Sequence, residues 1–321
     1  MIQPNHKDIK VVAIVGATAS GKSEAAVILA ERVNGEIVSA DSRQVYRGLD
    51  IGTAKPDAAT QARVPHHLIN ILDLTGEYSA AAFQDAARRA FKEIHDSGRL
   101  PIVVGGTGLY VSAALDNMSF PRTGQTSSVR ERIEKDAARL GAEGLYARLK
   151  SVDPKAAASI NPNNIRRIVR ALEVCELTGR PFSEAAGGFK NRQSVYDATF
   201  VGIKRAPEDL RKRIDLRVDR MLKDGWAEEA ANVMGGRGKI SRTAERALGY
   251  AEALAYARGE LTLAEATARI KKVTWAYARR QMTWFRADSR IFWIAAGRDE
   301  GAETLAGRVE WYLKRQGKVD K

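Results

Sequence analysis

The strongest chemical signal in the chain is an apolar run that leads directly into a glycine-rich loop. Residues 10–15 read Lys-Val-Val-Ala-Ile-Val, and the next eight residues fit the pattern G-x-x-x-x-G-K-[ST]. In such a loop successive backbone N–H groups point at one anion, and a following helix adds its N-terminal dipole. The sequence therefore predicts a phosphate-binding site made of Gly16, Ala17, Thr18, Ala19, Ser20, Gly21, Lys22 and Ser23, with the Ser23 hydroxyl available to Mg²⁺.

A carboxylate follows the second expected strand. Residues 36–40 are apolar in character and lead into Asp41. A carboxylate at the end of a strand, near a phosphate loop, suits a general base or a metal ligand. The same position also suits an aspartate that caps a turn or a helix N-terminus. The sequence leaves both interpretations open.

A second glycine-rich segment, Gly105-Gly106-Thr107-Gly108, follows the expected strand 101–104. Glycines allow a ligand to approach the backbone closely, and Thr107 offers a hydroxyl. The strand ends without the acidic residue that nucleotide-hydrolysing enzymes commonly use to hold Mg²⁺. The pattern therefore argues against ordinary ATP hydrolysis.

Several cationic segments could contact phosphates. Residues 204–223 hold eight Lys or Arg and four Asp or Glu, and Arg217 lies close to the apolar stripe of the expected helix, where its charge needs an anion nearby. Arg166, Arg167 and Arg170 crowd one side of another helix. Residues 275–286 interleave aromatic side chains with arginines, a composition that suits unpaired bases and phosphates. Core packing of Trp284 and Phe285 remains the alternative for those two.

The order of the elements predicts an α/β protein. Apolar runs that alternate with expected helices over 22–33 and 79–97 are typical of a parallel sheet covered by helices on both faces, as in P-loop NTPases. Residues 127–186 look wholly helical, and a strand returns at 199–203. We therefore expect a P-loop core over 1–120 and 196–321, interrupted by an all-helical insertion domain over 121–195.

Composition limits the class of partner. Over 321 residues the net charge is +13, with a pI near 9.8, which favours a polyanion such as nucleic acid over a membrane surface. The single cysteine, Cys175, excludes an intramolecular disulfide and is expected to be buried. No run of about 18 apolar residues predicts a membrane span. We expect a cytoplasmic monomer that does not contact a membrane.

The motifs together resemble one enzyme family. The phosphate loop, Asp41-Ser42-Arg43-Gln44-Val45-Tyr46 and Gly105-Gly106-Thr107-Gly108-Leu109-Tyr110 are followed by Arg166-Arg167-Ile168-Val169-Arg170-Ala171-Leu172-Glu173-Val174 and Arg279-Arg280-Gln281-Met282-Thr283-Trp284. This ordered set, spread over about residues 11 to 290, resembles the tRNA dimethylallyltransferase, or IPP transferase, family.

The resemblance implies transfer of a dimethylallyl group from dimethylallyl diphosphate to N6 of the adenine just 3′ of the anticodon. The phosphate loop would then hold the leaving diphosphate, with Mg²⁺ on Ser23 and with the charges of Lys22 and Arg217. Asp41 resembles the family's catalytic aspartate, and Thr107 matches its threonine near the adenine. The resemblance implies that the anticodon stem-loop contacts residues Asp41, Ser42, Arg43, Gln44, Thr107, Val129, Ile165, Arg166, Arg167, Ile168, Val169, Arg279, Arg280 and Gln281.

The sequence departs from the family at two places and leaves three other functions to be tested. Asn163-Asn164 stands where the family often has Asn-Asp, which puts a cap or contact of the second carboxylate in doubt, and Ser23 stands where Thr is common. The alternatives are an isopentenyltransferase acting on free AMP, ADP or ATP, a small-molecule or nucleotide kinase, and a non-catalytic RNA-binding protein. The high positive charge favours a large polyanion over a free nucleotide.

Overall fold

The computed structural model describes residues 6–120, 128–185, 192–235 and 240–319. It divides into two compact units, one formed by Met1–Leu115 with Val195–Lys321 and the other by Asp116–Ser194. The sequence places the insertion at 121–195, within a few residues of the second unit. Each unit is described by itself.

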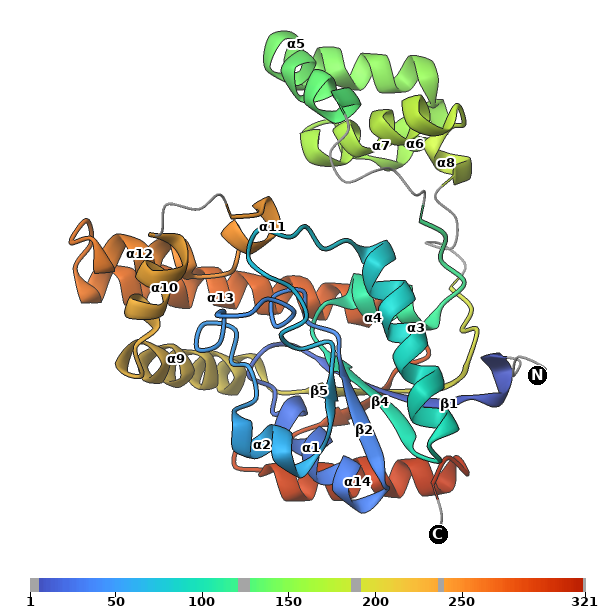
Figure 1. The fold of residues 1–321 in the computed structure, drawn as a ribbon, viewed down its shortest axis with the longest axis vertical. Coiled ribbons are helices and arrows are strands. Elements are labelled where there is room, and N and C mark those ends of the chain that lie inside the picture. The colour runs from blue at the N-terminus through green and yellow to red at the C-terminus, as the bar shows by residue number, and fades with distance from the viewer. Residues whose placement is uncertain (1–5, 121–127, 186–191, 236–239, 320–321) are drawn as a thin grey trace. The chain divides into compact units, whose positions relative to one another are not determined.

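Unit 1 is built on a six-stranded sheet in the order β3-β2-β4-β1-β5-β6, and every pairing in it is parallel. The strands are β1 (Lys10–Gly16), β2 (Gly35–Ser39), β3 (His66–His67), β4 (Leu100–Gly105), β5 (Asp197–Lys204) and β6 (Phe292–Ala295). Figure 1 shows the sheet with its helices. The predicted α/β class is confirmed. The central strand β1 is buried from Val11 to Gly16, as its unbroken apolar run requires.

Helices cover both faces of this sheet. On one face α3 (Ala80–Asp96) and α4 (Gly108–Leu115) pack against the strands through Phe83, Phe91 and Val111. On the other face α1 (Lys22–Arg32) and α14 (Ala302–Arg315) pack through Leu29 and Leu305. The loops of the site begin at the carboxyl ends of the strands that these two layers cover.

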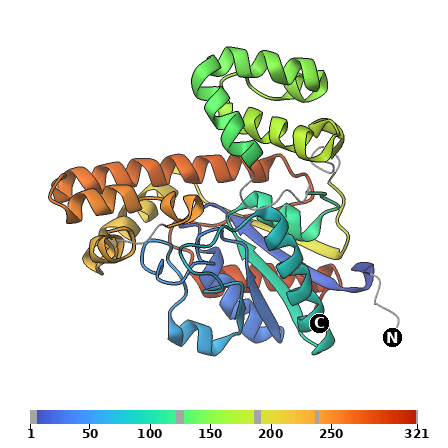
Figure 2. The same cartoon turned by 45° about the horizontal axis from the view of Figure 1, so that its top comes forward.

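A third apolar cluster joins the helices that follow β5. They are α9 (Pro207–Lys223), α10 (Trp226–Met234), α11 (Arg242–Glu245), α12 (Tyr250–Ala257) and α13 (Leu263–Arg286). Figure 2 shows α13 as one long helix that runs across unit 1. A capping box between Thr262 and Glu265 starts it. Two short elements, η1 (His6–Asp8) and α2 (Ala58–Arg63), complete the unit.

The regular elements in the described part of unit 2 are helices, and an isolated antiparallel bridge pairs Asp116 with Ser194. The unit contains α5 (Ser128–Val152), which is interrupted at Gly141, then α6 (Pro154–Ser159), α7 (Ile165–Thr178) and α8 (Phe182–Ala185). Its own core contains Ile133, Leu145, Leu149, Ile168 and Leu172. Asn164 caps α7, since its side-chain oxygen accepts a hydrogen bond from Arg167 N at 3.2 Å. The amide therefore supplies the cap that the sequence left in doubt for lack of a carboxylate.

The structure adds two strands that the sequence did not predict. β3 has two residues, both histidine, so it has neither the length nor the apolar pattern of a strand. β6 is a four-residue edge strand, and the signal for it was the apolar run from Ile291 to Ile294. Cys175 is buried, as expected. Within the described residues, no helix is long and apolar enough to span a membrane.

The packing of α3 gives a test of the fold. Phe83 is fully buried, and its ring stacks on Tyr110 with centroids 4.3 Å apart. Phe83→Ala should lower the free energy of unfolding by about 3 kcal/mol or more in urea denaturation, because it leaves a cavity between helix and sheet. Leu263→Ala, at a half-exposed position on α13, is the control and should change it by less than about 0.5 kcal/mol. Equal effects would contradict the assigned core.

Candidate active site

The carboxyl ends of three neighbouring strands bring the predicted chemical groups together. The phosphate loop follows β1, Asp41 follows β2 by two residues, and Thr107 follows β4 by two residues. Because these strands are adjacent and parallel, their following loops lie at the same edge of the sheet. Segments far apart in the sequence thus form one site within unit 1.

The phosphate loop has the backbone that its glycines predict. Gly16 has a φ of +152°, and a Cβ there would lie only 2.5 Å from the Ile203 carbonyl oxygen of the neighbouring strand β5. Gly21, at the N-cap of α1, has a φ of +95°. Both positions therefore need glycine, and the loop closes onto the N-terminus of α1.

Cationic side chains gather at this loop. Lys22 donates a hydrogen bond to the Ala17 carbonyl at 3.1 Å. The pKa of Lys22 is lowered to about 8, mainly by burial and also by the nearby Arg217 guanidinium, while the Asp41 carboxylate acts in the opposite direction. Burial also lowers the pKa of Arg217, whose charge is stabilised by Asp41 and Glu24. The expected anion or acid beside Arg217 is thus supplied in part by Asp41, and the concentrated positive charge favours a bound anion.

Asp41 holds a turn, which is one of the two interpretations that the sequence left open, and its role as a general base or metal ligand stays a prediction. Its Oδ1 accepts hydrogen bonds from Arg43 N at 2.8 Å and from Gln44 N at 3.4 Å, so it does hold a turn. It also lines the same cleft as Lys22 and Arg217. The turn fixes one carboxylate oxygen and thereby orients the side chain toward the cleft.

Thr107 lies close to a tyrosine that was not among the predicted site residues. Thr107 Oγ1 accepts a hydrogen bond from Ser42 N at 3.4 Å, which ties the loop after β4 to the loop after β2. The Tyr277 side chain lies close to the Thr107 and Gln281 side chains, and burial raises the pKa of Tyr277 while these two neighbours act in the opposite direction. Tyr277 lines the cleft with Asp41. Its place in the aromatic segment 275–286 was the available signal, but nothing in the sequence linked it to Thr107.

Gln281 joins α13 to the phosphate loop. Its Oε1 accepts a hydrogen bond from Thr18 N at 2.8 Å, and its Nε2 donates to the Gly106 carbonyl at 3.0 Å. The residue is 5% exposed, so its side-chain amide serves contacts within the protein. Contact of Gln281 with tRNA stays a prediction.

The glycines after β4 make room for side chains of another helix, and the close approach of a ligand that the sequence indicated for them stays a prediction. A Cβ at Gly106 would lie 2.0 Å from Gln281 Nε2, and one at Gly108 would lie 2.0 Å from Trp284 Cδ1. These glycines therefore admit side chains of α13. Phe285 is buried in the core and Trp284 packs against the same core, so packing accounts for these two aromatic residues.

A cleft of about 980 Å³ joins these groups. Its lining includes Asp41, Arg217 and Tyr277, and it extends past Pro56 to His66. The phosphate loop contributes Thr18, Ala19, Gly21, Lys22 and Ser23. The volume accommodates a diphosphate together with a second small reactant. All of the lining residues belong to unit 1.

The oxygen atoms that line this cleft fit a magnesium ion that is held mainly by the oxygens of a bound diphosphate. No cluster of three or more His, Cys, Asp or Glu occurs among the described residues. Ser23, which is exposed at the start of α1, and Asp41 both offer oxygen atoms to the cleft. Mg²⁺ prefers oxygen ligands and usually keeps water and substrate phosphates among them. The residues present fit that pattern, and Mg²⁺ itself stays a prediction.

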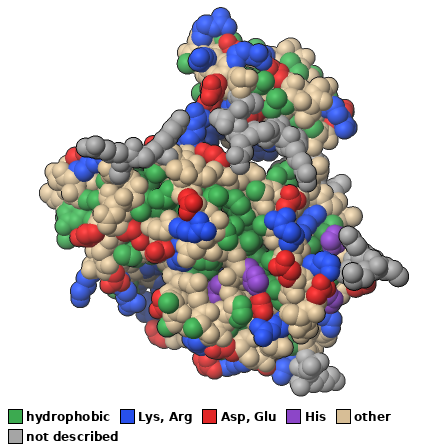
Figure 3. Space-filling view, viewed as in Figure 1, with side chains coloured by type: hydrophobic (Ala, Val, Ile, Leu, Met, Phe, Trp, Pro, Cys, Tyr) green, Lys and Arg blue, Asp and Glu red, His purple; other side chains and the backbone are tan. Residues whose placement is uncertain are grey.

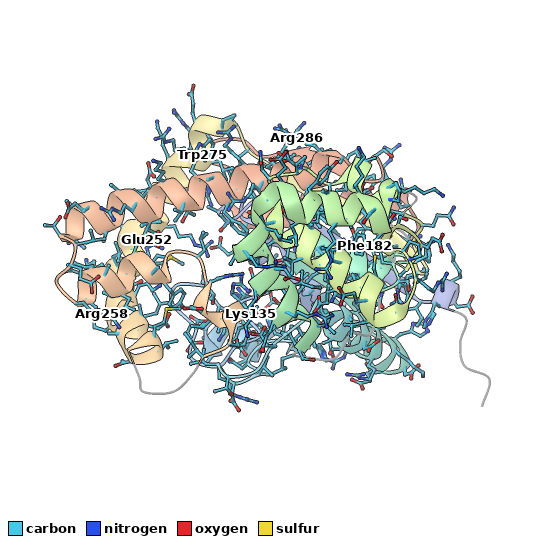
Figure 4. The ribbon with its side chains drawn as sticks, turned by 90° about the horizontal axis from the view of Figure 1, so that it is seen from above. Lys135, Phe182, Glu252, Arg258, Trp275 and Arg286 are labelled. Carbon is cyan, nitrogen blue, oxygen red and sulfur yellow. The ribbon has the colours of Figure 1, made fainter. Side chains whose placement is uncertain are left out.

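The tRNA-contact residues predicted in unit 1 lie in two groups. Arg43 donates to the Ser42 and Arg246 carbonyls, and Gln44 Nε2 donates to the Thr53 and Ala54 carbonyls. Arg279 and Arg280 are exposed on α13, where Arg280 lies over the Tyr277 ring. Figure 4 shows Trp275 and Arg286 on the same helix. The cationic end of α13 is therefore the accessible part of this set.

In unit 2 some of the residues predicted to contact tRNA are exposed and others are buried. Ile165 and Arg167 are exposed at the start of α7, and Arg166 is also exposed. Ile168 is fully buried and Val169 nearly so, both in the core of the unit, against which Val129 packs. The buried pair can support a contact surface but cannot offer side chains to it.

Charge is distributed unevenly over the molecule. Figure 3 shows positive and negative side chains interspersed on the face of unit 1 in view. Despite the net charge of +13, that face therefore does not present a continuous positive surface. A polyanion would depend on local groups such as Arg279 and Arg280.

Comparison with known proteins identifies the family. The model of the IPP transferase family matches residues 44–288, which is most of the chain. The chain belongs to the IPP transferase family. This confirms the resemblance seen in the motifs.

Individual relatives agree with this assignment. A tRNA dimethylallyltransferase of Streptomyces coelicolor is 47% identical over 90% of this chain and 91% of its own. The crystal structure of the tRNA isopentenylpyrophosphate transferase of Bacillus halodurans is 40% identical, covers 97% of this chain and 98% of that one, and gives a TM-score of 0.67. A eukaryotic dimethylallyltransferase acting on tRNA is 26% identical, with a TM-score of 0.79 over 97% of this chain and 81% of that one.

The low pKa of Lys22 predicts how anion binding depends on pH. Below about 8 the side chain is already charged, whereas above it a bound anion must first recruit a proton. The affinity for inorganic pyrophosphate, measured by calorimetry, should therefore fall by up to about tenfold per pH unit as the pH rises through about 8. Lys22→Arg carries a charge that does not titrate there, so it should flatten the profile. Identical profiles for the two proteins would show that Lys22 does not titrate on binding.

Proposed function

We propose that this chain transfers the dimethylallyl group of dimethylallyl diphosphate to N6 of the adenine 3′-adjacent to the anticodon of tRNA. One observation carries the proposal. A phosphate loop, a carboxylate and the two arginine-containing helices α9 and α13 of unit 1 line one cleft, in a chain of the IPP transferase family. The named relatives act on tRNA, which makes tRNA the acceptor to test first.

The leaving group would occupy the phosphate loop. The adenine N6 attacks C1 of the dimethylallyl group while the C1–O bond breaks, and the bonding electrons leave with pyrophosphate. Loop N–H groups, Lys22 and Arg217 lie where they would stabilise that growing negative charge. Bound Mg²⁺, held by Ser23 and diphosphate oxygens, would add further neutralisation of the leaving group.

Asp41 would receive the proton that N6 loses. The exocyclic amine of adenine is a weak nucleophile, so removal of its proton during attack lowers the barrier. Asp41 lines the cleft beside the phosphate loop, with one oxygen fixed by the turn to Arg43 and Gln44. Arg217 lies near Asp41, whose carboxylate stabilises the guanidinium charge, so the proposed base and the proposed stabiliser of the leaving group share one cleft.

The adenine must leave its stack to reach this carboxylate, as other enzymes that modify bases require. Thr107 and Tyr277 meet each other beside Asp41, and their hydroxyls offer hydrogen-bond partners to a base. Arg279 and Arg280 on α13, together with the exposed start of α7 in unit 2, would contact the anticodon stem-loop. We further propose that the enzyme acts as a monomer in the cytoplasm.

A comparison of two acceptors, tRNA and AMP, tests this function against transfer to a free nucleotide. Labelled dimethylallyl diphosphate and Mg²⁺ are supplied with unmodified tRNA in one reaction and with AMP in another, followed by mass analysis of the nucleosides. Label on the adenine beside the anticodon, with none on AMP, is the expected result. Label on AMP alone would assign the chain to nucleotide-level transfer. Absence of label from both would overturn transfer altogether.

Asp41→Asn separates catalysis from binding. The amide keeps an oxygen for the Arg43 and Gln44 N–H groups, so the turn should survive, but it cannot accept the N6 proton. Transfer should fall on the order of 10²-fold, with tRNA affinity changed by less than about twofold. Full activity in this variant would remove Asp41 from the role of base.

Replacement of Arg279 and Arg280 by Gln tests the tRNA surface. Loss of two phosphate contacts should weaken tRNA binding and make the plot of log affinity against log salt less steep by about two. Arg258→Gln with Arg298→Gln, two exposed arginines of unit 1 outside the predicted surface, is the matched control. An unchanged salt slope in the α13 variant would move the contacts elsewhere.

A further inference from the structure

Cationic side chains donate hydrogen bonds to the carbonyl oxygens of the phosphate loop. Arg213 Nε donates to the Ala19 carbonyl at 3.0 Å, and Arg205 Nε donates to the Ser20 carbonyl at 3.0 Å. Lys22 donates to the Ala17 carbonyl. Carbonyl oxygens repel an anion, so a loop whose carbonyls are paired with cationic donors is better suited to bind one.

Arg205 is the buried member of this set. Its side chain is 1% exposed, and it follows directly after β5, the strand beside β1. The register pairs Gly16 with Ile203, which places Arg205 two residues beyond the start of the phosphate loop. The position of the guanidinium is therefore set by the central sheet.

The guanidinium is fixed by groups on both sides. Besides Ser20, it donates to Asp209 Oδ2 at 3.2 Å, to the Gly297 carbonyl at 2.5 Å and to the Glu300 carbonyl at 2.9 Å. Most of these partners are neutral carbonyls, which orient the group without cancelling its charge. A buried arginine held this closely cannot turn away from the loop.

The hydrogen bond from Arg205 to the Ser20 carbonyl also determines the direction of the next backbone N–H, because both belong to one planar peptide group. In a trans peptide the C=O and the following N–H point in opposite directions. Since Arg205 holds the Ser20 carbonyl, the Gly21 N–H of the same plane points away from it, at the N-cap of α1. A Cβ on Gly21 would lie 3.5 Å from Arg205 Nη2, and Gly21 lines the cleft.

We propose that Arg205 is a positioning residue for the diphosphate: it fixes the Ser20–Gly21 peptide so that the Gly21 N–H faces the anion before the anion binds. The role rests on the proposed function, because the diphosphate is the leaving group of that reaction. Arg205 itself lies beneath the loop and acts through it. The preformed loop lowers the cost of ordering N–H groups around the anion.

The test measures pyrophosphate affinity and transfer kinetics in Arg205→Lys and Arg205→Gln. Lysine keeps the charge but cannot reach Ser20, Gly297 and Glu300 together. We expect Arg205→Lys to weaken pyrophosphate binding, and to raise KM for dimethylallyl diphosphate, on the order of tenfold, and Arg205→Gln to do so more strongly. KM for tRNA should change by less than about twofold, a split that simple loss of stability would not produce.

Arg308→Lys is the matched control. Arg308 donates to the Ala295 carbonyl and to Glu300, so it supports the same turn after β6, and neither contact is with the phosphate loop. Its variant should lower the melting temperature and leave pyrophosphate affinity unchanged. If Arg205→Lys behaves as Arg308→Lys does, Arg205 only stabilises the fold and the proposal is overturned.

Asp209→Asn covers the case in which the Arg205 variants do not fold. It removes the neutralising carboxylate and keeps an oxygen for the guanidinium, so pyrophosphate affinity should equal or exceed that of the unaltered protein. Weaker binding would contradict the proposal.

The role of Arg205 and the proposed function can be tested separately, because pyrophosphate binding needs no tRNA. Unaltered protein that binds pyrophosphate without modifying tRNA would overturn the proposed function alone.

Discussion

The proposed anion site depends on the backbone of one short loop, in which cationic side chains pair with the carbonyl oxygens and leave N–H groups for the anion. Glycine at 16 and 21 makes that backbone accessible, but conformational freedom alone also permits other arrangements. The hydrogen bonds from cations to the Ala17, Ala19 and Ser20 carbonyls favour the arrangement that suits the proposed anion. The positive charge that favours the anion therefore also shapes its binding site.

That arrangement links the two reactants of a transferase. Gln281 binds the phosphate loop at Thr18 and the loop of Thr107 at Gly106, while Arg279 and Arg280 lie exposed next to it in sequence. One helix thus contacts the phosphate loop and carries exposed cations, which suits the proposed binding of a diphosphate and of tRNA. Asp41 stabilises the charge of Arg217 in the same cleft, so the proposed base and the proposed stabiliser of the leaving group form one electrostatic unit.

The local parts of this design could be predicted from the sequence, and the long-range parts could not. The phosphate loop, the strands on either side of β1 and the carboxylate at 41 carry their signals within a few residues. Tyr277 and Arg205 carry no such signal, because their roles depend on packing against residues more than a hundred positions away. The glycines at 106 and 108 indicate room for a ligand, but the sequence did not show that they also make room for Gln281 and Trp284. The sequence also could not show which predicted contact residues of unit 2 are exposed. It did not distinguish Ile168, which is buried, from Arg167, which is exposed.

The claim at the centre of this account is that the phosphate loop holds a leaving diphosphate and not a nucleotide that is consumed. The most direct measurement supplies dimethylallyl diphosphate, Mg²⁺ and unmodified tRNA with no nucleotide triphosphate, and counts released pyrophosphate against dimethylallyl-adenosine formed. The account predicts one pyrophosphate for each modified adenine, with no stimulation by ATP. A requirement for ATP, or modification without matching release of pyrophosphate, would contradict it.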